Sequence, residues 1–227
     1  MAEIIFSAPS GSSFSLTDLV EWDDFLGGSP TSLAIGKFGW GLVAATSGTV
    51  ASTSGHPGIF GLSVGATAVG SLYLSGPNGA LGPLAANIKS VSYVANYPTG
   101  ANVPDKILGI TSTSVAAAPA DDAVYFECLA ADTNWFAVTR DGATTNQTRT
   151  DTGVAFSAGT WVRFRIEHPS TQVWQFYMND VLKATHTAAN NAPAEASGMF
   201  YLFQMSTKGT ALVANLDFFA TRLVTVR

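Results

Sequence analysis

The stretch from residue 123 to residue 187 alternates apolar and polar side chains with a period of two. It divides into four runs rich in aromatic and β-branched residues, with turn signals between them: AVYFECLA, NWFAVTRDG, TWVRFRIEH and VWQFYMNDVLKATHT. Successive side chains of a strand point to opposite faces, so the third run separates its residues into an apolar and a charged set. The two sets are Val162, Phe164 and Ile166 against Arg163, Arg165 and Glu167. The sequence therefore predicts antiparallel strands with one buried face.

The rest of the chain repeats short apolar runs separated by turn residues. Between residues 37 and 75, and again between 90 and 113, candidate strands recur about every 8–12 residues, which is typical of a sandwich or a barrel. No apolar period of 3.6 residues extends beyond about three turns, so we expect little helix. We assign residues 21–227 to a single sandwich domain and residues 1–20 to an N-terminal arm or edge strand.

The charge composition narrows the classes of partner. Only 12% of the residues are charged, the net charge is −5, and Lys and Arg form no cluster. A nucleic-acid binder needs a basic face, so this class is disfavoured. No run approaches the ~20 apolar residues that span a membrane, and no secretory leader is visible at the start. We therefore expect synthesis in a cytoplasm and no membrane partner.

The sequence shows no arrangement of residues suited to nucleophilic catalysis. Cys128 is the only cysteine, and alternation places it beside Phe126 on an apolar strand face, where we expect a buried, unreactive thiol. His56 and His168 each precede a proline, and His186 lies at a strand end. No G-x-S-x-G elbow occurs. The sequence predicts no serine or cysteine triad.

Several segments occur in a recognisable order between residues 21 and 227. They are EWDDFLGG, SGHPGIFGLSVGAT, GTWVRFRIE, VWQFYMNDVL and NLDFFATRL. Together they resemble the concanavalin A-like lectin/glucanase sandwich, related to laminin-G domains, found in structural proteins of tailed bacteriophages. The resemblance implies an all-β fold, a two-sheet antiparallel jelly-roll sandwich with six or seven strands in each sheet. It implies no activity, since this fold hosts lectins, glycosidases and virion modules alike.

Glucanases of this fold use two glutamates that flank an aspartate at period two, which places all three carboxylates on one face. Retaining hydrolysis requires two carboxyl groups about 5–5.5 Å apart. The nearest candidates here are residues 21–24 (EWDD) and Asp121-Asp122 with Glu127, and neither has two glutamates at that spacing. We expect Glu127 and Glu167 to share the outer face of one sheet in a cross-strand charge network. The sequence therefore predicts a protein that is not an enzyme.

Two binding sites remain open. A sugar stacks its CH face on an exposed aromatic ring beside amide and charged groups. We expect these on the wet face of the central sheet and assign glycan binding to Tyr125, Arg163, Arg165, Gln175 and Tyr177. Sandwich lectins also often hold Ca²⁺ with loop carboxylates. Because first and last strands often pair in this fold, a structural Ca²⁺ site would use Asp23, Asp24 and Asp217; otherwise we expect no cofactor.

The resemblance, the low charge and the apolar richness together predict a non-enzymatic virion structural protein of a tailed phage. It would act through protein–protein contacts as a capsid decoration or as a fibre or tail appendage module. The expected partners are copies of itself, for example in a trimer, and capsid or tail proteins at the virion surface, after synthesis in the bacterial host cytoplasm. The alternatives are a carbohydrate-binding, lectin-like module that contacts host surface glycan and, last, a glycoside hydrolase.

Overall fold

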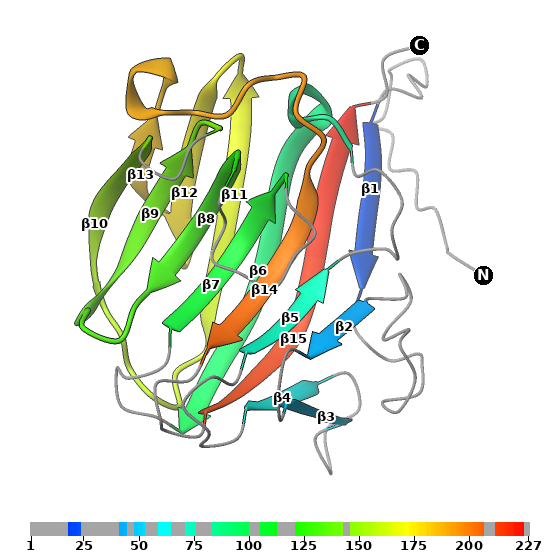
Figure 1. Ribbon diagram of the computed structural model, residues 1–227, viewed down its shortest axis with the longest axis vertical. Helices are drawn as coiled ribbons and strands as arrows, with labels where there is room; N and C mark the ends of the chain where they lie inside the picture. Colours follow the sequence, from blue (N-terminus) through cyan, green and yellow to red (C-terminus); the bar gives the residue numbers. More distant parts are fainter. Residues whose placement is uncertain are drawn as a thin grey trace, which may run out of the picture.

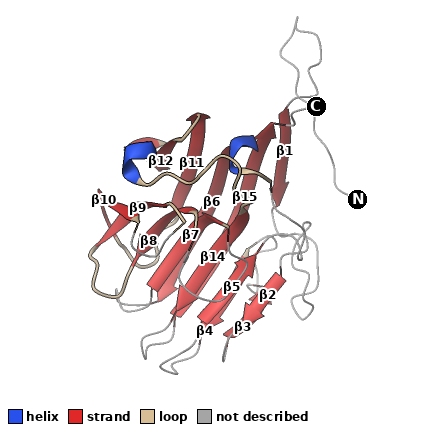
Figure 2. Cartoon of the chain, turned by 45° about the horizontal axis from the view of Figure 1, so that its top comes forward, coloured by secondary structure: helices blue, strands red, loops and turns tan. Residues whose placement is uncertain are grey.

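The computed structural model describes residues 18–23, 41–44, 48–52, 59–64, 71–75, 83–99, 105–112, 121–142, 146–206 and 212–224. Within them the chain forms strands in two sheets and two short 3₁₀ helices, Ala85–Asn87 and Ala188–Asn190. Figure 2 shows both helices at the same end of the sheets. No helix in these ranges is long and apolar enough to cross a membrane. The expectation of little helix is confirmed for these residues.

The strands form two antiparallel sheets that lie face to face (Figure 1). The eight-stranded sheet contains β1 (Asp18–Asp23), β3 (Gly48–Ser52), β4 (Phe60–Val64), β6 (Ile88–Thr99), β11 (Val162–Ser170), β12 (Val173–Met178), β13 (Val181–His186) and β15 (Leu212–Val224). The seven-stranded sheet contains β2 (Gly41–Ala44), β5 (Ser71–Ser75), β7 (Asp105–Thr111), β8 (Ala123–Cys128), β9 (Asn134–Arg140), β10 (Gln147–Ala155) and β14 (Phe200–Ser206). The predicted two-sheet antiparallel jelly-roll sandwich is confirmed.

Strand order within the sheets mixes distant parts of the chain. The eight-stranded sheet runs β13-β12-β11-β6-β15-β4-β3, and the seven-stranded sheet runs β10-β9-β8-β7-β14-β5-β2. The long strand β15 pairs with β6 on one side, and on the other with β4 through Leu212–Leu216 and with β1 through Phe219–Val224. The predicted pairing of first and last strands is thus present. Residues 1–17 of the predicted arm lie outside the described residues.

The core lies between the sheets and follows the period-two pattern. Phe164 and Ile166 of β11 are 0% and 1% exposed, whereas Arg163 on the opposite face is exposed. The ring of Phe164 packs 4.7 Å from that of Trp135 in the other sheet, and Phe126 lies 5.3 Å from Phe176. Each such fully buried side chain stabilises the fold by about 2–3 kcal/mol. The expected sidedness of β11 is confirmed.

Two local features set the strand geometry. Asn179 and Asp180 join β12 to β13 with φ values of 49° and 64°, the left-handed pair that a tight two-residue hairpin requires. Asparagine and aspartate tolerate such φ values better than most residues. Strand β10, which pairs with β9, was not among the runs expected to form strands, because its inward face carries more threonines than apolar residues. Thr152, for example, donates to the carbonyl oxygen of Trp135 at 2.7 Å.

Cys128 is buried with 0% exposure, as expected, and packs in the core cluster. Burial raises the pKa of its thiol to about 11, although nearby Lys106 opposes the shift. A thiol with so high a pKa carries little thiolate at neutral pH and is a poor nucleophile. The predicted inert role of Cys128 agrees with this environment.

Candidate functional site

Four of the five predicted glycan-binding residues lie together on the outer face of the eight-stranded sheet. Arg163 and Arg165 project from β11, and Gln175 and Tyr177 from β12, because their neighbours along each strand point into the core. The register places Arg165 directly opposite Tyr177 and Glu167 opposite Gln175. We call this surface, together with Ser90, Ser92 and Arg222, the polar face.

Contacts within the polar face hold its side chains in place. The guanidinium of Arg165 lies 4.1 Å from the centre of the Tyr177 ring and forms an ion pair with Glu167. The Tyr177 hydroxyl donates to Oε1 of Gln175 at 2.9 Å. These groups are partly exposed, so each ion pair stabilises the fold by only about 0–1 kcal/mol. The network therefore positions the side chains more than it stabilises the sheet.

The hairpin turn anchors the two arginines. Asp180 accepts from Nη1 of Arg163 at 3.2 Å, and its other oxygen lies 3.8 Å from Nη2 of Arg165. Oδ1 of Asn179 accepts from the backbone N–H of Arg163 at 3.0 Å. Both residues of the β12–β13 turn thus contact the neighbouring strand β11 and fix the end of the polar face.

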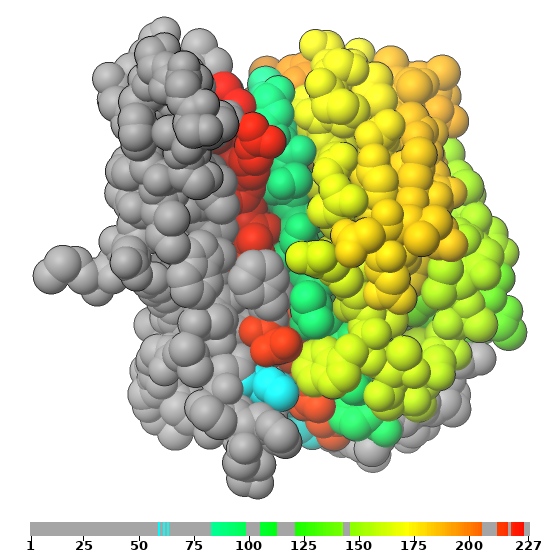
Figure 3. Space-filling model, turned by 180° about the vertical axis from the view of Figure 1, so that it is seen from behind, coloured from blue at the N-terminus to red at the C-terminus, as the bar shows by residue number. Residues whose placement is uncertain are grey.

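Two cross-strand rows make up the centre of this face. One row follows Leu182, Tyr177, Arg165, Ser92 and Ala220, and the next follows Thr185, Gln175, Glu167, Ser90 and Arg222. The residues contributed by β6 are small in both rows, whereas β11 and β12 contribute long or aromatic side chains. Figure 3 shows β15 and β6 side by side on this face, with β11 and β12 next to them.

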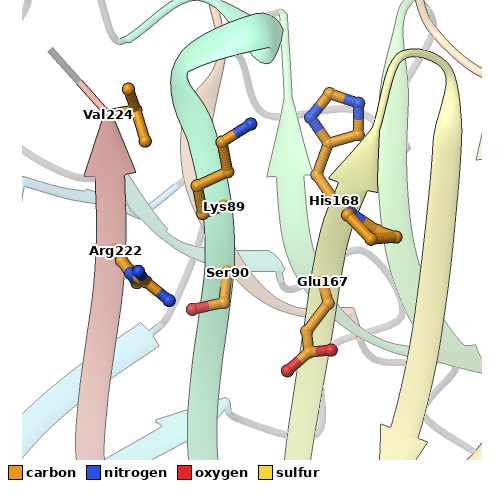
Figure 4. A pocket seen from close by; sticks show the side chains of 7 residues that line it. Lys89, Ser90, Glu167, His168, Arg222 and Val224 are labelled. Atoms are coloured by element: carbon orange, nitrogen blue, oxygen red, sulfur yellow. The ribbon is translucent and has the colours of Figure 1, made fainter. Parts of the chain in front are cut away.

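A pocket of about 340 Å³ lies at one end of the polar face. It is lined by Lys89, Ser90, Glu167, His168, Pro169, Arg222 and Val224 (Figure 4). Ser90 pairs with Arg222 and Ile88 with Leu223, so Lys89 is an extra residue in β6. Such a β-bulge redirects side chains, and here it lets Lys89 and Ser90 both line the pocket. The volume is at the lower end of the range for small-ligand sites.

His168 closes the pocket from inside the sheet. Its ring stacks on Trp174 with 4.2 Å between centres, Nδ1 lies 3.2 Å from the carbonyl oxygen of Ile88, and Nε2 lies 3.1 Å from Oε1 of Glu195. Burial lowers the pKa of His168, and the carboxylate of Glu195 opposes that shift. Both ring nitrogens of His168 face acceptors within the protein and are engaged there. The residue therefore serves as a wall of the pocket.

The placement of Tyr125 on the same face is wrong. Tyr125 lies on β8 in the seven-stranded sheet and is 2% exposed, packed with Val138 and Leu202. Burial raises the pKa of its hydroxyl. Alternation along β8 was interpreted correctly, but all six residues of this strand are buried, so neither of its faces is wet.

The expected network joining Glu127 to Glu167 is wrong for the same reason, because Glu127 also lies on β8. Glu127 is 3% exposed, and its Oε1 accepts from Nε of Arg149 at 2.5 Å. The same guanidinium binds Asp132 and lies 3.4 Å from the centre of the Phe136 ring. Burial raises the pKa of Glu127, while the hydrogen bond from Arg149 opposes the shift. These contacts form an ion-pair network.

One set of carboxylates considered for hydrolysis, Asp122 with Glu127, does not come together. Asp122 and Glu127 lie at opposite ends of β8, five extended residues or about 16 Å apart. Asp122 accepts instead from the backbone N–H of Gly142 at 2.7 Å and from the hydroxyl of Ser197. Glycoside hydrolysis needs carboxyl groups about 5–9.5 Å apart. This pair is therefore not a hydrolase pair.

The predicted Ca²⁺ site is described only in part. Asp217 is exposed on β15, and Asp23 pairs through its backbone with Phe219 of the same strand. Asp24 lies outside the described residues. Among the described side chains, no group of three or more His, Cys, Asp or Glu residues is arranged to hold a metal ion. The Ca²⁺ site stays a prediction.

Comparison with known proteins places the chain in a family. The model of the SO2946-like C-terminal domain matches residues 55–217. The chain belongs to the SO2946-like C-terminal domain family. Protein SO2946 of Shewanella oneidensis MR-1, of unknown function, has the same fold, with a TM-score of 0.66 and 16% identity over 95% of this chain and 91% of that chain. No curated protein matches the sequence.

Other structures share the fold of this SO2946-like domain at low identity. A glycoside hydrolase family 16 endo-glucanase from Bacteroides ovatus gives a TM-score of 0.60 at 9% identity, over 87% of this chain and 98% of that chain. Botulinum neurotoxin type C, whose cell entry depends on two ganglioside molecules, gives 0.54 at 12%, over 82% of this chain and 43% of that chain. The concanavalin A-like part of the resemblance is confirmed as a fold.

Sequence reasoning missed the pocket of this SO2946-like domain. Lys89 and Arg222 are 133 positions apart, and only the pairing of β6 with β15 brings them together. The alternation of β6 gave a partial signal, since a lysine directly after the buried Ile88 marks a change of face. The bulge that places Ser90 on the same side as Lys89 has no local sequence signature here.

Proposed function

We propose that this SO2946-like domain is a carbohydrate-binding, lectin-like module and that the glycan binds along the polar face. The observation that carries the proposal is the stacked pair of Arg165 and Tyr177 beside the amide of Gln175. An aromatic ring receives the CH face of a sugar, while amide and guanidinium groups bind hydroxyls at its rim. The polar face offers all three kinds of group within two adjacent strands.

The fixed geometry of these groups favours binding. Glu167 and Asp180 hold the Arg165 guanidinium, and Gln175 holds the Tyr177 hydroxyl. Side chains that are already ordered lose less conformational entropy when a ligand binds, which improves affinity. The small residue Ser90 lines the pocket at the end of the polar face, next to the row that contains this pair.

Two kinds of relative support a glycan-related role. The neurotoxin and the endo-glucanase described above share this fold. Cell entry of the neurotoxin depends on ganglioside, and the endo-glucanase is a glycoside hydrolase. Identities of 9–12% carry the fold alone, so residue roles do not transfer. We propose binding without hydrolysis, because Glu167 and Asp180 both bind the Arg165 guanidinium.

A glycan array followed by calorimetry tests this function. The wild-type chain should bind at least one class of oligosaccharide. Tyr177→Ala should weaken that binding about two- to tenfold, since a lost aromatic stack costs about 0.5–1.5 kcal/mol. Gln147→Ala, at an exposed position on β10 of the other sheet, serves as the control and should bind as the wild type does. A blank array, or equal affinity of Tyr177→Ala and wild type, would refute the proposal.

The edge strand β13 favours a second function in protein–protein contact. Val181 and Leu182 are 55% and 47% exposed, and among the described strands β13 has only β12 as a neighbour in its sheet. An open apolar edge is a template for pairing with another chain. It supports the proposal of a self-associating structural module, such as a virion surface protein of a tailed phage that contacts capsid or tail proteins.

Light scattering after size-exclusion chromatography tests this second function. We expect a trimer or a larger oligomer at 10–100 µM, and dissociation in Val181→Lys, which places a charge on the edge. Lys183→Ala on the same strand is the matched control. A monomer at every concentration would exclude self-association through β13.

A further inference from the structure

We propose that the pocket at the end of the polar face is a subsite for an anionic substituent of the glycan, either a carboxylate or a sulfate ester. The ligand class would then be acidic glycans. This inference rests on the proposed glycan-binding function and specifies its ligand.

The pocket brings two cations and a hydroxyl to one place. Lys89 and Ser90 come from β6, and Arg222 comes from the neighbouring strand β15 (Figure 4). In a regular strand, Lys89 and Ser90 would point to opposite faces. The bulge at Lys89 turns both toward the pocket, so the Ser90 hydroxyl joins the two cations.

The charges around the pocket favour an anion. Among the residues that line the pocket, Lys89 and Arg222 carry two positive charges and Glu167 carries one negative charge, which is already paired with Arg165. Glu195 lies behind His168 and accepts from the His168 ring and from the backbone N–H of Gln172 at 2.6 Å. The pocket is thus locally positive in a chain whose net charge is −5. Guanidinium and ammonium groups bind carboxylate and sulfate oxygens by charge-assisted hydrogen bonds.

The pocket lies at the end of the row next to the stacking pair. The row that contains Glu167, Ser90 and Arg222 is next to the row that contains Arg165 and Tyr177. Strands β12 and β15 are three places apart in the sheet, or about 14 Å at about 4.8 Å for each strand spacing. A short oligosaccharide that stacks on Tyr177 can therefore place a charged group of a neighbouring sugar between Lys89 and Arg222.

Calorimetry with three oligosaccharides of equal length tests the inference. One is a neutral galactan fragment, one is an oligogalacturonate with carboxylates, and one is a carrageenan fragment with sulfate esters. We expect at least one acidic fragment to bind the full chain about tenfold more tightly than the neutral one at low salt. That advantage should shrink at 0.5 M salt, where the screening length is only a few ångströms.

Two variants separate the pocket from general electrostatics. Lys89→Gln should weaken binding of the acidic fragment about fivefold and leave the neutral fragment unchanged. Arg222→Gln should weaken binding of the acidic fragment more than it weakens binding of the neutral one, because Arg222 also belongs to the polar face. Lys183→Gln removes a cation from β13, outside the pocket, and should change neither. Circular dichroism melts should show that all three variants are folded.

The outcomes also separate this inference from the function beneath it. Equal affinity for neutral and acidic fragments, or an equal loss in Lys89→Gln and Lys183→Gln, would overturn the anionic subsite while leaving glycan binding intact. Absence of binding by all three fragments and a blank array would overturn both.

Discussion

His186 should make the stability of the sandwich depend on pH. Its ring lies between the sheets at the β13 edge and is 2% exposed. Nδ1 lies 2.8 Å from the Thr139 hydroxyl and Nε2 lies 2.8 Å from the Thr150 hydroxyl. Thr139 donates its own proton to the carbonyl oxygen of Asn190 at 2.5 Å, so it accepts from Nδ1–H. The neutral tautomer with its proton on Nδ1 satisfies all these groups.

Burial lowers the pKa of His186 from 6.5 to about 4. Below pH 6.5 the unfolded chain binds a proton that the folded chain does not, so the stability present above that pH is lost as pH falls toward 4. A shift of this size corresponds to about 3 kcal/mol at most, and to about 2 kcal/mol after allowing for screening and water penetration at a sheet edge.

Urea unfolding between pH 7.0 and pH 4.5 measures this effect. The wild type should lose about 2 kcal/mol more of its unfolding free energy over this range than His186→Gln, which keeps hydrogen-bonding groups but does not titrate. Titration of His168 and of the carboxyl groups is common to both proteins and cancels in the difference. Parallel pH profiles of the two proteins would refute the assigned environment of His186.

Three further substitutions and one double variant test the packing of the seven-stranded sheet. Gly109→Ala should cost about 3 kcal/mol or more in thermal melts, because a Cβ there would lie 2.3 Å from the carbonyl oxygen of Val124; Gly153→Ala, with no atom within 4 Å but a φ of 67°, should cost about 1 kcal/mol. Arg149→Met leaves Glu127 buried without its cation and should cost about 3 kcal/mol at pH 7 in urea unfolding. Adding Glu127→Gln should recover part of that loss, and an Arg149→Met protein as stable as wild type would show that the ion pair is dispensable.

The strands, and which of their side chains face the core, could be predicted where one face of a strand is exposed to solvent. Phe164 and Arg165 follow each other on opposite faces of β11, and period-two alternation is enough to assign them. The Asn179-Asp180 turn could equally be predicted, because few residue pairs tolerate two positive φ values in succession.

The assignment of strands to sheets could not be predicted in this way. Alternation says that Tyr125 and Glu127 share a face, but whether that face is wet depends on the sheet in which β8 lies and on what covers it. The pocket depends on long-range pairing as well, since Lys89 and Arg222 meet only through β6 and β15. Four of the five proposed glycan-binding residues could be grouped because β11 and β12 form a local hairpin.

The Asn179-Asp180 turn couples hairpin geometry to the arginines of the proposed glycan-binding face. An Asn-Gly turn would suit the backbone better, because glycine adopts a positive φ without strain. It would also remove the carboxylate that holds Arg163 and Arg165. Selection for thermal resistance alone would favour glycine at position 180, and selection for recognition would keep the aspartate. On the proposed glycan-binding function, a homologue with glycine at that position should therefore melt at a higher temperature and bind glycan more weakly.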